Sequence, residues 1–330
     1  MANLVTERVY KFDITEGKRK ERLDLYLANT MERATRSRIQ QLIKAGYVKV
    51  NGKIQKANYK INPKDTVVVT IPCSPRPDKT EPEDIPLNIV HEDEYLLIVN
   101  KPAGMVVHPS LGNFTGTMVN ALLHHTQNLS EFNSNSRPGI VHRIDKETSG
   151  LLVVAKDEYT HSHLAKQFAA HTIEREYQAV CWGLFKQKKG EISGNITRSK
   201  KDRKVFSVHE TDGKYAHTFY EVIEEFEFAS LVKLKLLTGR THQIRVHLAY
   251  INHPVFGDPV YNGRKIIYGA ELPKMKARVS NLLEIMKRQA LHAKTLGFIH
   301  PATEKYVSFN SSLPEDIDEL IKKMSVNFSE

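Results

Sequence analysis

Residues 141–155 have the sequence VHRIDKETSGLLVVA. The first ten combine a short polar turn with one carboxylate, Asp145, close to the titratable or cationic side chains of His142 and Arg143. The apolar run that starts at Leu151 follows at once and predicts a buried strand. Such a turn can hold a single ionised aspartate in a cleft, although an aspartate in a turn more often makes only local hydrogen bonds and a surface ion pair.

This stretch resembles the signature of the pseudouridine synthases of the RluA/RluD family, usually written H-R-[LI]-D-x-x-T-S-G-[LI], and its fixed polar and glycine positions agree in order. The resemblance implies an isomerase that converts uridine to pseudouridine in RNA, exchanging a C–N for a C–C glycosidic bond. Asp145 would be its nucleophile, and attack at the ribose C1′, attack at the uracil C6 and elimination from the sugar all stay open. A carboxylate is an adequate covalent catalyst when it is desolvated and aligned.

Other motifs extend the resemblance over almost the whole chain. They occupy residues 100–109 (NKPAGMVVHP), 174–180 (EREYQAV), 239–248 (GRTHQIRVHL), 257–261 (GDPVY) and 288–293 (RQALHA). Arg175 stands where the second of these motifs usually has lysine. The resemblance implies that Tyr177 stacks on the uracil, with a part in moving the C5 proton, whereas a single tyrosine in a strand is otherwise more often a packed aromatic. It also implies that Arg245 pairs with Asp145, where its charge would keep the carboxylate ionised. Because a guanidinium can hold a carboxylate with two parallel hydrogen bonds, we expect that geometry for this pair.

The remaining site residues are expected to contact RNA. Because the target uridine lies inside a stack or duplex, it must be flipped out, and Arg143 is the candidate to occupy the vacated place. Thr241 is expected to cap a helix whose N-terminus, helped by Arg240 and Arg245, would seat an anion, either a phosphate or Asp145. The expected RNA-binding residues are Arg36, Arg38, Lys44, His142, Arg143, Arg198, Arg203, Arg240 and Leu291.

The positive charge of the chain is concentrated near its N-terminus. Of the formal net charge of +10, +8 falls within residues 1–75, which hold 15 lysines and arginines against 7 acidic residues. A small module with this charge favours a polyanion, and nucleic acid is the usual one. Charge by itself fits a solvated basic surface about as well.

Short elements are expected in this basic segment. Residues 21–30 and 35–46 predict two helices, residues 48–54 a hairpin around an Asn-Gly turn, and residues 66–71 a further strand. Together with the sequences RLD at 22–24 and TRSR at 35–38, this order of elements resembles the S4 RNA-binding module. The resemblance covers about residues 18–75.

A change of composition separates this module from the rest of the chain. Residues 76–86, rich in proline and charged residues, predict a stiff and exposed linker. The resemblance implies a catalytic domain over residues 87–325, with a mixed, mostly antiparallel sheet flanked by helices. The expected class is α+β, with a small α/β S4-like domain in front. Residues 186–204 carry a second basic cluster and predict either a hairpin that clamps a phosphate backbone or a flexible solvated loop. Residues 263–287 have no assigned role.

Several other classes of protein are disfavoured. The chain has no run of about 18 apolar residues and no signal-peptide core at its N-terminus, so a cytoplasmic protein without a membrane span is expected. Cys73 and Cys181 lie far apart, which argues against a disulfide framework and against a zinc cluster of cysteines. The sequence contains neither a G-x-G-x-x-G motif nor a P-loop, and no metal or cofactor is expected. We expect a monomer.

Three functional hypotheses remain. The first is a pseudouridine synthase for structured large-subunit (23S) ribosomal RNA, favoured because the family's short tRNA-directed members often lack an S4 module. The second is a tRNA pseudouridine synthase of the same family. The third is a non-catalytic RNA-binding or ribosome-assembly factor, against which the presence of Asp145, Tyr177 and Arg245 argues. The target uridines cannot be read from the sequence, because RNA shape selects them.

Overall fold

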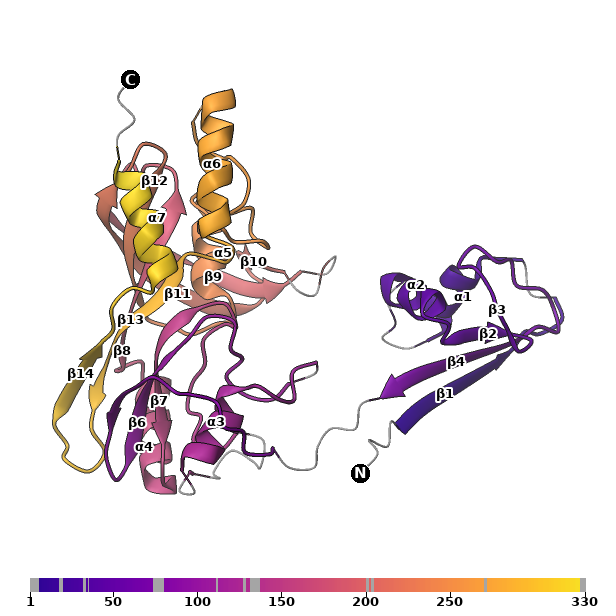
Figure 1. Ribbon diagram of the computed structural model, residues 1–330, viewed down its shortest axis with the longest axis horizontal. Coiled ribbons are helices and arrows are strands. Elements are labelled where there is room, and N and C mark those ends of the chain that lie inside the picture. The colour runs from indigo at the N-terminus through magenta and orange to yellow at the C-terminus, as the bar shows by residue number, and fades with distance from the viewer. Residues whose placement is uncertain are drawn as a thin grey trace. The chain divides into compact units, whose positions relative to one another are not determined.

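The computed structural model describes residues 6–17, 20–31, 34, 36–73, 80–110, 112–126, 129–130, 137–199, 202, 205–269 and 272–326. The chain divides into two compact units, Met1–Asp78 and Lys79–Glu330, each with a hydrophobic core of its own (Figure 1). No helix in the described ranges is long and apolar enough to cross a bilayer.

The N-terminal unit is a four-stranded antiparallel sheet with two helices packed on it. Its strand order is β1-β4-β2-β3. The bounds are β1 (Thr6–Asp13), α1 (Leu23–Thr30), α2 (Arg36–Lys44), β2 (Val48–Val50), β3 (Lys53–Ile54) and β4 (Thr66–Cys73). The two helices and the hairpin agree with the expectation, and Asn51 and Gly52 have the positive φ that a two-residue hairpin turn requires. Strand β1 lies outside the range 18–75 expected for this module and pairs with β4 along its whole length.

A buried carboxylate ties α1 to α2. Asp24 is fully buried and accepts hydrogen bonds from Arg22 Nε at 2.9 Å, Arg36 Nε at 3.0 Å and Gln40 Nε2 at 2.7 Å. The hydrogen bond from Arg22 makes the largest contribution to holding the pKa of Asp24 far below its ordinary value. Charged residues of the RLD and TRSR sequences therefore stabilise the packing of the module, and the half-exposed Arg36 combines that task with a position at the surface.

The second unit is built on one ten-stranded sheet. The strand order is β10-β9-β11-β12-β8-β13-β7-β6-β5, and β14 pairs with β13. Among the pairings of the described strands, β7 with β13 is parallel and the others are antiparallel. The strands are β5 (Ile89–Glu92), β6 (Leu96–Lys101), β7 (Ser149–Ala155), β8 (Glu174–Trp182), β9 (Lys189–Arg198), β10 (Phe206–His209), β11 (Lys214–Glu225), β12 (Ala229–Leu236), β13 (Leu291–Ile299) and β14 (Tyr306–Asn310). The helices are α3 (Met118–His125), α4 (Glu158–Ala169), α5 (Gln243–Tyr250), α6 (Pro273–Ile285) and α7 (Glu315–Ser325). The expected α+β class, with a mixed and mostly antiparallel sheet flanked by helices, is confirmed.

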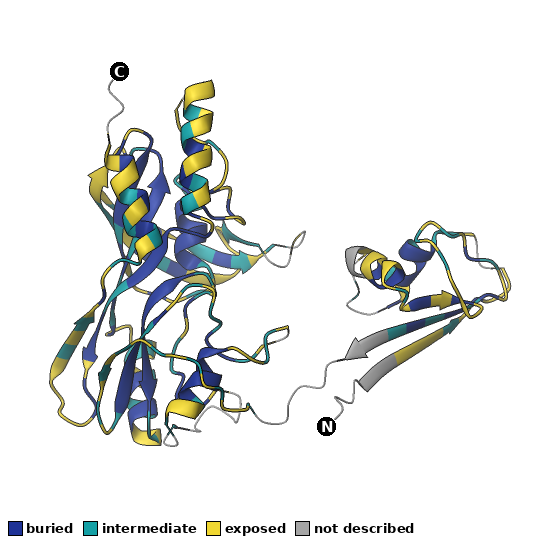
Figure 2. Cartoon of the chain, in the orientation of Figure 1, coloured by how far each residue is buried: buried dark blue, intermediate teal, exposed yellow. Residues whose placement is uncertain are grey.

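Every residue of strand β7 is buried, so the strand is covered on both faces, and it is dark blue in Figure 2. Leu152 and Val154 belong to a core cluster that includes α3, whereas Leu151 and Val153 pack in a second cluster with Leu164 of α4. A strand buried on both faces has no polar face to alternate with, so it reads as a continuous apolar run. This explains why the sequence after the polar turn is so uniformly apolar.

Gly150 lets β7 and β13 approach each other closely. It has φ 118°, and a Cβ atom there would lie 2.2 Å from the carbonyl oxygen of Ala293. Only glycine avoids this clash, so the last fixed position of the 141–150 stretch is set by strand packing. The approach also brings the preceding turn to the residues that lead into β13, where Gln289 Nε2 donates to Thr148 Oγ1 at 3.2 Å.

Candidate functional site

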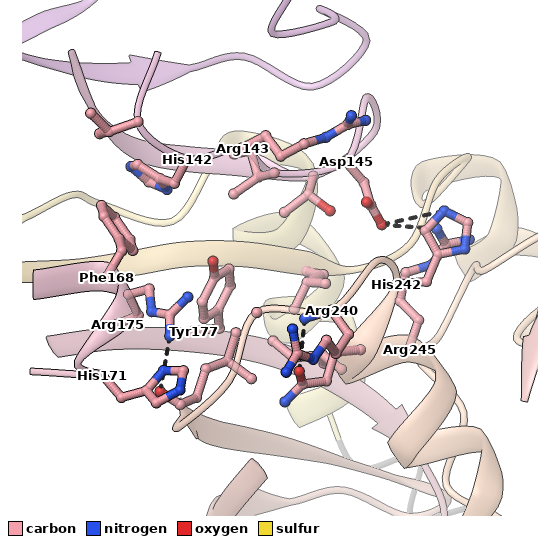
Figure 3. Close-up of a pocket in the computed structure, with 18 of the residues that line it drawn as sticks. His142, Arg143, Asp145, Phe168, His171, Arg175, Tyr177, Arg240, His242 and Arg245 are labelled. Carbon is pink, nitrogen blue, oxygen red and sulfur yellow. Dashed lines mark hydrogen bonds and ion pairs between the residues drawn. The ribbon is translucent and has the colours of Figure 1, made fainter. Parts of the chain in front are cut away.

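A pocket of about 560 Å³ lies where the 141–148 segment, the end of α4, strand β8 and the start of α5 meet (Figure 3). It brings together seven of the expected site residues, namely Asp145, Tyr177, Arg245, His142, Arg143, Arg240 and Leu291. Among the residues that the structure describes, no group of three His, Cys, Asp or Glu side chains is arranged as a metal site.

Arg245 connects Asp145 to a second aspartate that is fully buried. Its Nη1 donates to Asp145 Oδ2 at 3.0 Å, while its Nε and Nη2 donate to the two oxygens of Asp258 at 2.6 and 2.9 Å. The expected pair of parallel hydrogen bonds from Arg245 to Asp145 is therefore wrong, because Asp258 receives that pair. A fully buried carboxylate needs more donors than Asp145, whose side chain is 22% exposed toward the pocket.

Asp258 is a site residue to which sequence reasoning gave no role. It also accepts the backbone N–H groups of Val260 at 2.8 Å and Tyr261 at 3.2 Å. Burial by itself would lower the pKa of Arg245, but the hydrogen bond and charge of Asp258 raise it overall. The sequence shows the GDPVY motif that contains Asp258. Its partner Arg245 lies 13 positions upstream on helix α5, and the two residues come into contact only in the folded chain.

His242 is a second residue that the sequence did not single out. Its Nδ1 lies 2.9 Å from the hydroxyl oxygen of Tyr261, which accepts the backbone N–H of Phe206 at 3.0 Å. The tyrosine hydroxyl can then donate to Nδ1, which assigns the ring proton of a neutral His242 to Nε2, 3.9 Å from Asp145 Oδ2. Burial lowers the pKa of His242 and favours this neutral ring. A left-handed φ of 55° aims the side chain, a conformation that often marks functional positions.

The start of α5 differs from the expectation. Its first helical residue is Gln243, its N-cap is His242, and no side chain caps the backbone there, so the predicted Thr241 cap is wrong. The turn is closed instead by Gln243, whose Oε1 accepts the Thr238 hydroxyl at 2.8 Å and the Arg240 N–H at 2.9 Å. Arg240 also donates from Nε to the Tyr215 carbonyl at 2.9 Å, which fixes this arginine at the pocket wall.

His142 and Arg143 line the pocket in different ways. The backbone N–H of Val153 donates to His142 Nε2 at 3.0 Å, and the imidazole ring stacks on Phe168 at 4.6 Å between centroids. Burial lowers the pKa of His142 to about 3, so the ring is uncharged and forms part of the pocket wall. Arg143 is exposed, as a residue that enters an RNA helix must be.

The other expected RNA-binding residues are Arg198 in the second unit, which is not among the residues that line this pocket, and Arg36, Arg38, Lys44 and Arg203. Lys44 is exposed at the last turn of α2. Arg198 is exposed at the end of β9, with its guanidinium 5.2 Å from the ring centroid of Phe206. Strand β9 pairs with β10 as a hairpin, and a hairpin or a flexible loop was expected over residues 186–204. The side chains of Arg38 and Arg203 lie outside the described part of the chain.

A buried lysine holds the turn that follows Asp145. The Nζ atom of Lys101, at the end of β6, donates to the carbonyl oxygens of Pro102 at 2.6 Å, Met105 at 2.9 Å and Lys146 at 3.0 Å. Burial lowers the pKa of Lys101 to about 7, yet donating to three oxygens at once uses all three N–H groups of the ammonium form. The 100–109 motif thereby fixes the backbone beside the nucleophile candidate.

Arg288 fixes the next residue of the same turn. Its Nη1 donates to the Glu147 carbonyl at 2.9 Å, and its Nε and Nη2 form a two-point ion pair with Asp316 of α7 at 2.7 and 2.8 Å. The position of Asp145 therefore depends on α7, an element far away in the sequence.

Two family models match the chain. The model described as RNA pseudouridylate synthase matches residues 95–250, and the S4 domain model matches residues 21–67. Among solved structures, human RNA pseudouridylate synthase domain containing 4 aligns with a TM-score of 0.56 at 23% identity, over 74% of this chain and 95% of that chain. This likeness supports the fold of the second unit.

Several relatives align along nearly the whole chain. The uncharacterized RNA pseudouridine synthase YlyB of Bacillus subtilis is 47% identical over 319 residues, or 96% of this chain and 99% of its own length. Ribosomal large subunit pseudouridine synthase D is 46% identical in Zymomonas mobilis, over 93% of this chain and 94% of that protein, and 40% identical in Escherichia coli, over 96% and 94%. The chain therefore belongs to the RNA pseudouridine synthase family and carries an S4 domain ahead of its synthase domain.

Proposed function

We propose that this RNA pseudouridine synthase, an isomerase, acts on uridines of large-subunit ribosomal RNA. Relatives named for that substrate are 40–46% identical over both units of the chain. The S4 domain adds a second RNA-binding surface, which suits a large structured RNA better than a short one. A tRNA uridine is the second candidate. A purely structural role in ribosome assembly would not need an intact pocket around Asp145.

One observation carries the catalytic part of this proposal: Asp145 faces a pocket large enough for a nucleotide, and Arg245 holds its carboxylate at 3.0 Å. In the proposed reaction the C1′–N1 bond breaks, the base turns, and a C1′–C5 bond forms while C5 loses its proton. Asp145 is the nucleophile, or promotes elimination, from the same position near the sugar. Arg245 aims it, and Arg143 fills the space that the flipped uridine leaves.

Sequencing of carbodiimide-treated RNA from cells with and without the gene tests the substrate. Carbodiimide adducts that survive alkali mark pseudouridine, so the loss of specific sites in large-subunit ribosomal RNA is the expected result. If sites are lost from tRNA while ribosomal RNA is unchanged, the second candidate is correct. No lost site in either RNA would contradict the proposal.

Tyr177→Phe tests how the tyrosine takes part. Burial raises the pKa of Tyr177, so its hydroxyl is neutral and acts as a hydrogen-bond group, while its ring lies in the pocket wall. Phenylalanine keeps the stacking surface, and we expect RNA binding to stay normal while the single-turnover rate falls by about 10². A normal rate would mean that the hydroxyl has no part in proton transfer.

Removal of residues 1–75 should weaken RNA binding more than chemistry. Eight net positive charges leave with this segment, whereas the pocket belongs wholly to the second unit. The slope of log K against log salt should become shallower by roughly 0.7 to 0.9 for each lost phosphate contact. At saturating enzyme, a control measurement of single-turnover rate should stay near that of the full chain. An unchanged slope would show that the S4 domain does not touch the RNA backbone.

A further inference from the structure

Arg175 is a buried guanidinium in the pocket wall that is short of partners. The residue is only 8% exposed, and its Nε has no hydrogen-bond partner among the residues that the structure describes. Its Nη2 reaches the carbonyl oxygen of Leu236 at 3.5 Å, which is the outer limit of a hydrogen bond. Burial lowers the pKa of Arg175, and the smaller contribution that opposes burial comes from Tyr177 rather than from a carboxylate.

This situation is unusual for a buried cation in this protein. Arg288 is equally buried, but it forms a two-point ion pair with Asp316, and Arg245 does the same with Asp258. The ring of Phe168, 5.5 Å from the Arg175 guanidinium carbon, opposes only part of the lost hydration. Arg175 therefore lines a pocket in which the described residues offer its donors only the distant Leu236 carbonyl as an acceptor.

Strand β8 sets the spacing of the groups in the pocket. Arg175 and Tyr177 are two residues apart, so both point to the same face and lie about 7 Å apart along the strand. The charges of Arg175 and Asp145 act on the Tyr177 hydroxyl with opposite effects, and Figure 3 shows the tyrosine between the two. The pocket thus has a carboxylate end, an aromatic middle and a guanidinium end.

Uracil matches this order of groups. When N1 and the sugar lie at Asp145 and the ring lies on Tyr177, the C4 carbonyl is on the opposite side of the ring, toward Arg175. A guanidinium only donates hydrogen bonds, and O4 of uracil only accepts them. Cytosine presents an amino group at that position, which would leave two sets of donors facing each other.

We infer that Arg175 recognises O4 of the flipped uridine, selects uracil against cytosine, and stabilises the negative charge that the base acquires during the reaction. The inference rests on the proposed placement of the sugar at Asp145 and of the base on Tyr177. It makes Arg175 a catalytic residue in addition to Asp145, Tyr177 and Arg245.

The charge follows from the bond changes. Breaking the C1′–N1 bond sends its electron pair to the base and leaves a uracil anion, with charge spread over O2 and O4. Addition at C6 instead sends electrons through C5 and C4 to O4. When C5 has bonded to C1′, C5 loses its proton and N1 gains one, so the base is neutral again and the product is an isomer of the substrate. A fixed cation in a partly dry pocket is an effective stabiliser of such transient charge.

A substitution at Gly239 tests the role of the Arg175 guanidinium in a second way. A Cβ atom at position 239 would lie 2.8 Å from Arg175 Nη1, so Gly239→Ala should displace the guanidinium while Arg175 itself is retained. If Arg175 acts as inferred, this variant should show a milder form of the Arg175→Gln defect.

The test compares Arg175→Gln with the wild-type enzyme on one RNA that carries uridine, 5-fluorouridine or cytidine at the target position. For uridine we expect the single-turnover rate to fall by about 10², the effect of removing one preorganised donor. Fluorine stabilises the anion of the base, so cleavage of 5-fluorouridine, followed by chromatography of the digested nucleosides, should be impaired less. Cytidine RNA should compete about tenfold better against the variant than against the wild-type enzyme.

Controls separate this inference from a general loss of charge or of folding. Lys235→Gln removes an exposed cation from the neighbouring strand β12 and should turn over uridine normally. Arg175→Lys keeps a donor-only cation, so it should still exclude cytidine RNA even if Arg175→Gln does not fold. Turnover of uridine by the wild-type enzyme tests the proposed function independently of Arg175.

Other results would overturn the inference. A normal rate for Arg175→Gln would do so. Equal loss of binding for uridine and cytidine RNA, with a salt slope shallower by roughly 0.7 to 0.9, would show that Arg175 holds a phosphate instead. Equal competition by cytidine RNA against the wild-type, lysine and glutamine forms would show that the pocket does not read O4 through this residue.

Discussion

Asp145→Asn should abolish isomerisation while RNA binding stays nearly intact. The amide has the shape of the carboxylate, and its oxygen can still accept the 3.0 Å hydrogen bond from Arg245 Nη1. It lacks the negative charge that makes a carboxylate a nucleophile. Tritium release from C5-labelled uridine in RNA measures the reaction directly, because C5 loses its proton only when the new C–C bond has formed.

The same preparation should be checked for RNA affinity, so that a loss of binding is not mistaken for a loss of chemistry. Turnover by the asparagine variant within tenfold of the wild-type rate would contradict the proposed role of Asp145. Residual activity at that level would have to come from a different nucleophile in the pocket.

Arg245→Lys is expected to lower turnover by about 10² or more, with RNA binding little changed. Lysine offers one ammonium in place of a guanidinium that now serves Asp258 with two nitrogens and Asp145 with a third. The fully buried Asp258 has the greater need of a counter-charge, so the ammonium should remain beside it. Asp145 should then lose the hydrogen bond that orients its carboxylate. Misplacing a reacting group by an ångström acts on this scale.

Single-turnover rates across pH distinguish two roles of Arg245, namely orienting the Asp145 carboxylate and keeping it ionised. A rate that stays low at every pH supports the geometric role. A rate that is normal, or that returns simply when the pH is raised, would mean that Arg245 only tunes protonation of the site or binds a phosphate. Thermal unfolding of the variant is the control, because loss of the Asp258 contact would lower the melting temperature as well.

Elements with a strong local pattern could be predicted from the sequence. The apolar run after Gly150 predicted β7 because a strand covered on both faces is apolar throughout. The hairpin at residues 48–54 was predicted because Asn51 and Gly52 tolerate the positive φ of its turn. Strand β1 escaped prediction because its partner β4 lies more than fifty residues later, and pairing over that distance leaves no local signal.

The sequence predicts the site residues that lie within short motifs. It does not predict contacts in which one side chain serves residues from distant segments. Asp145, Tyr177 and Arg245 do line one pocket, as the motifs implied. The division of Arg245 between two aspartates could not be foreseen, because it depends on which carboxylate is buried more deeply. The Thr241 cap was predicted wrongly because His242 adopts a left-handed conformation and takes the N-cap position. The ring of His242 contacts Tyr261, a residue distant in the sequence, so no local pattern indicates this conformation.

The ion pair between Arg288 and Asp316 also has a consequence for protein synthesis. The chain is made from its N-terminus, so Asp145 leaves the ribosome long before Asp316 and α7 do. Until α7 docks, Arg288 lacks its carboxylate, and the Glu147 carbonyl lacks a firmly placed donor. A nascent or proteolytically shortened chain can then hold every residue of the pocket without the geometry that chemistry requires. We therefore expect that only molecules that have been synthesised and folded past α7 modify RNA.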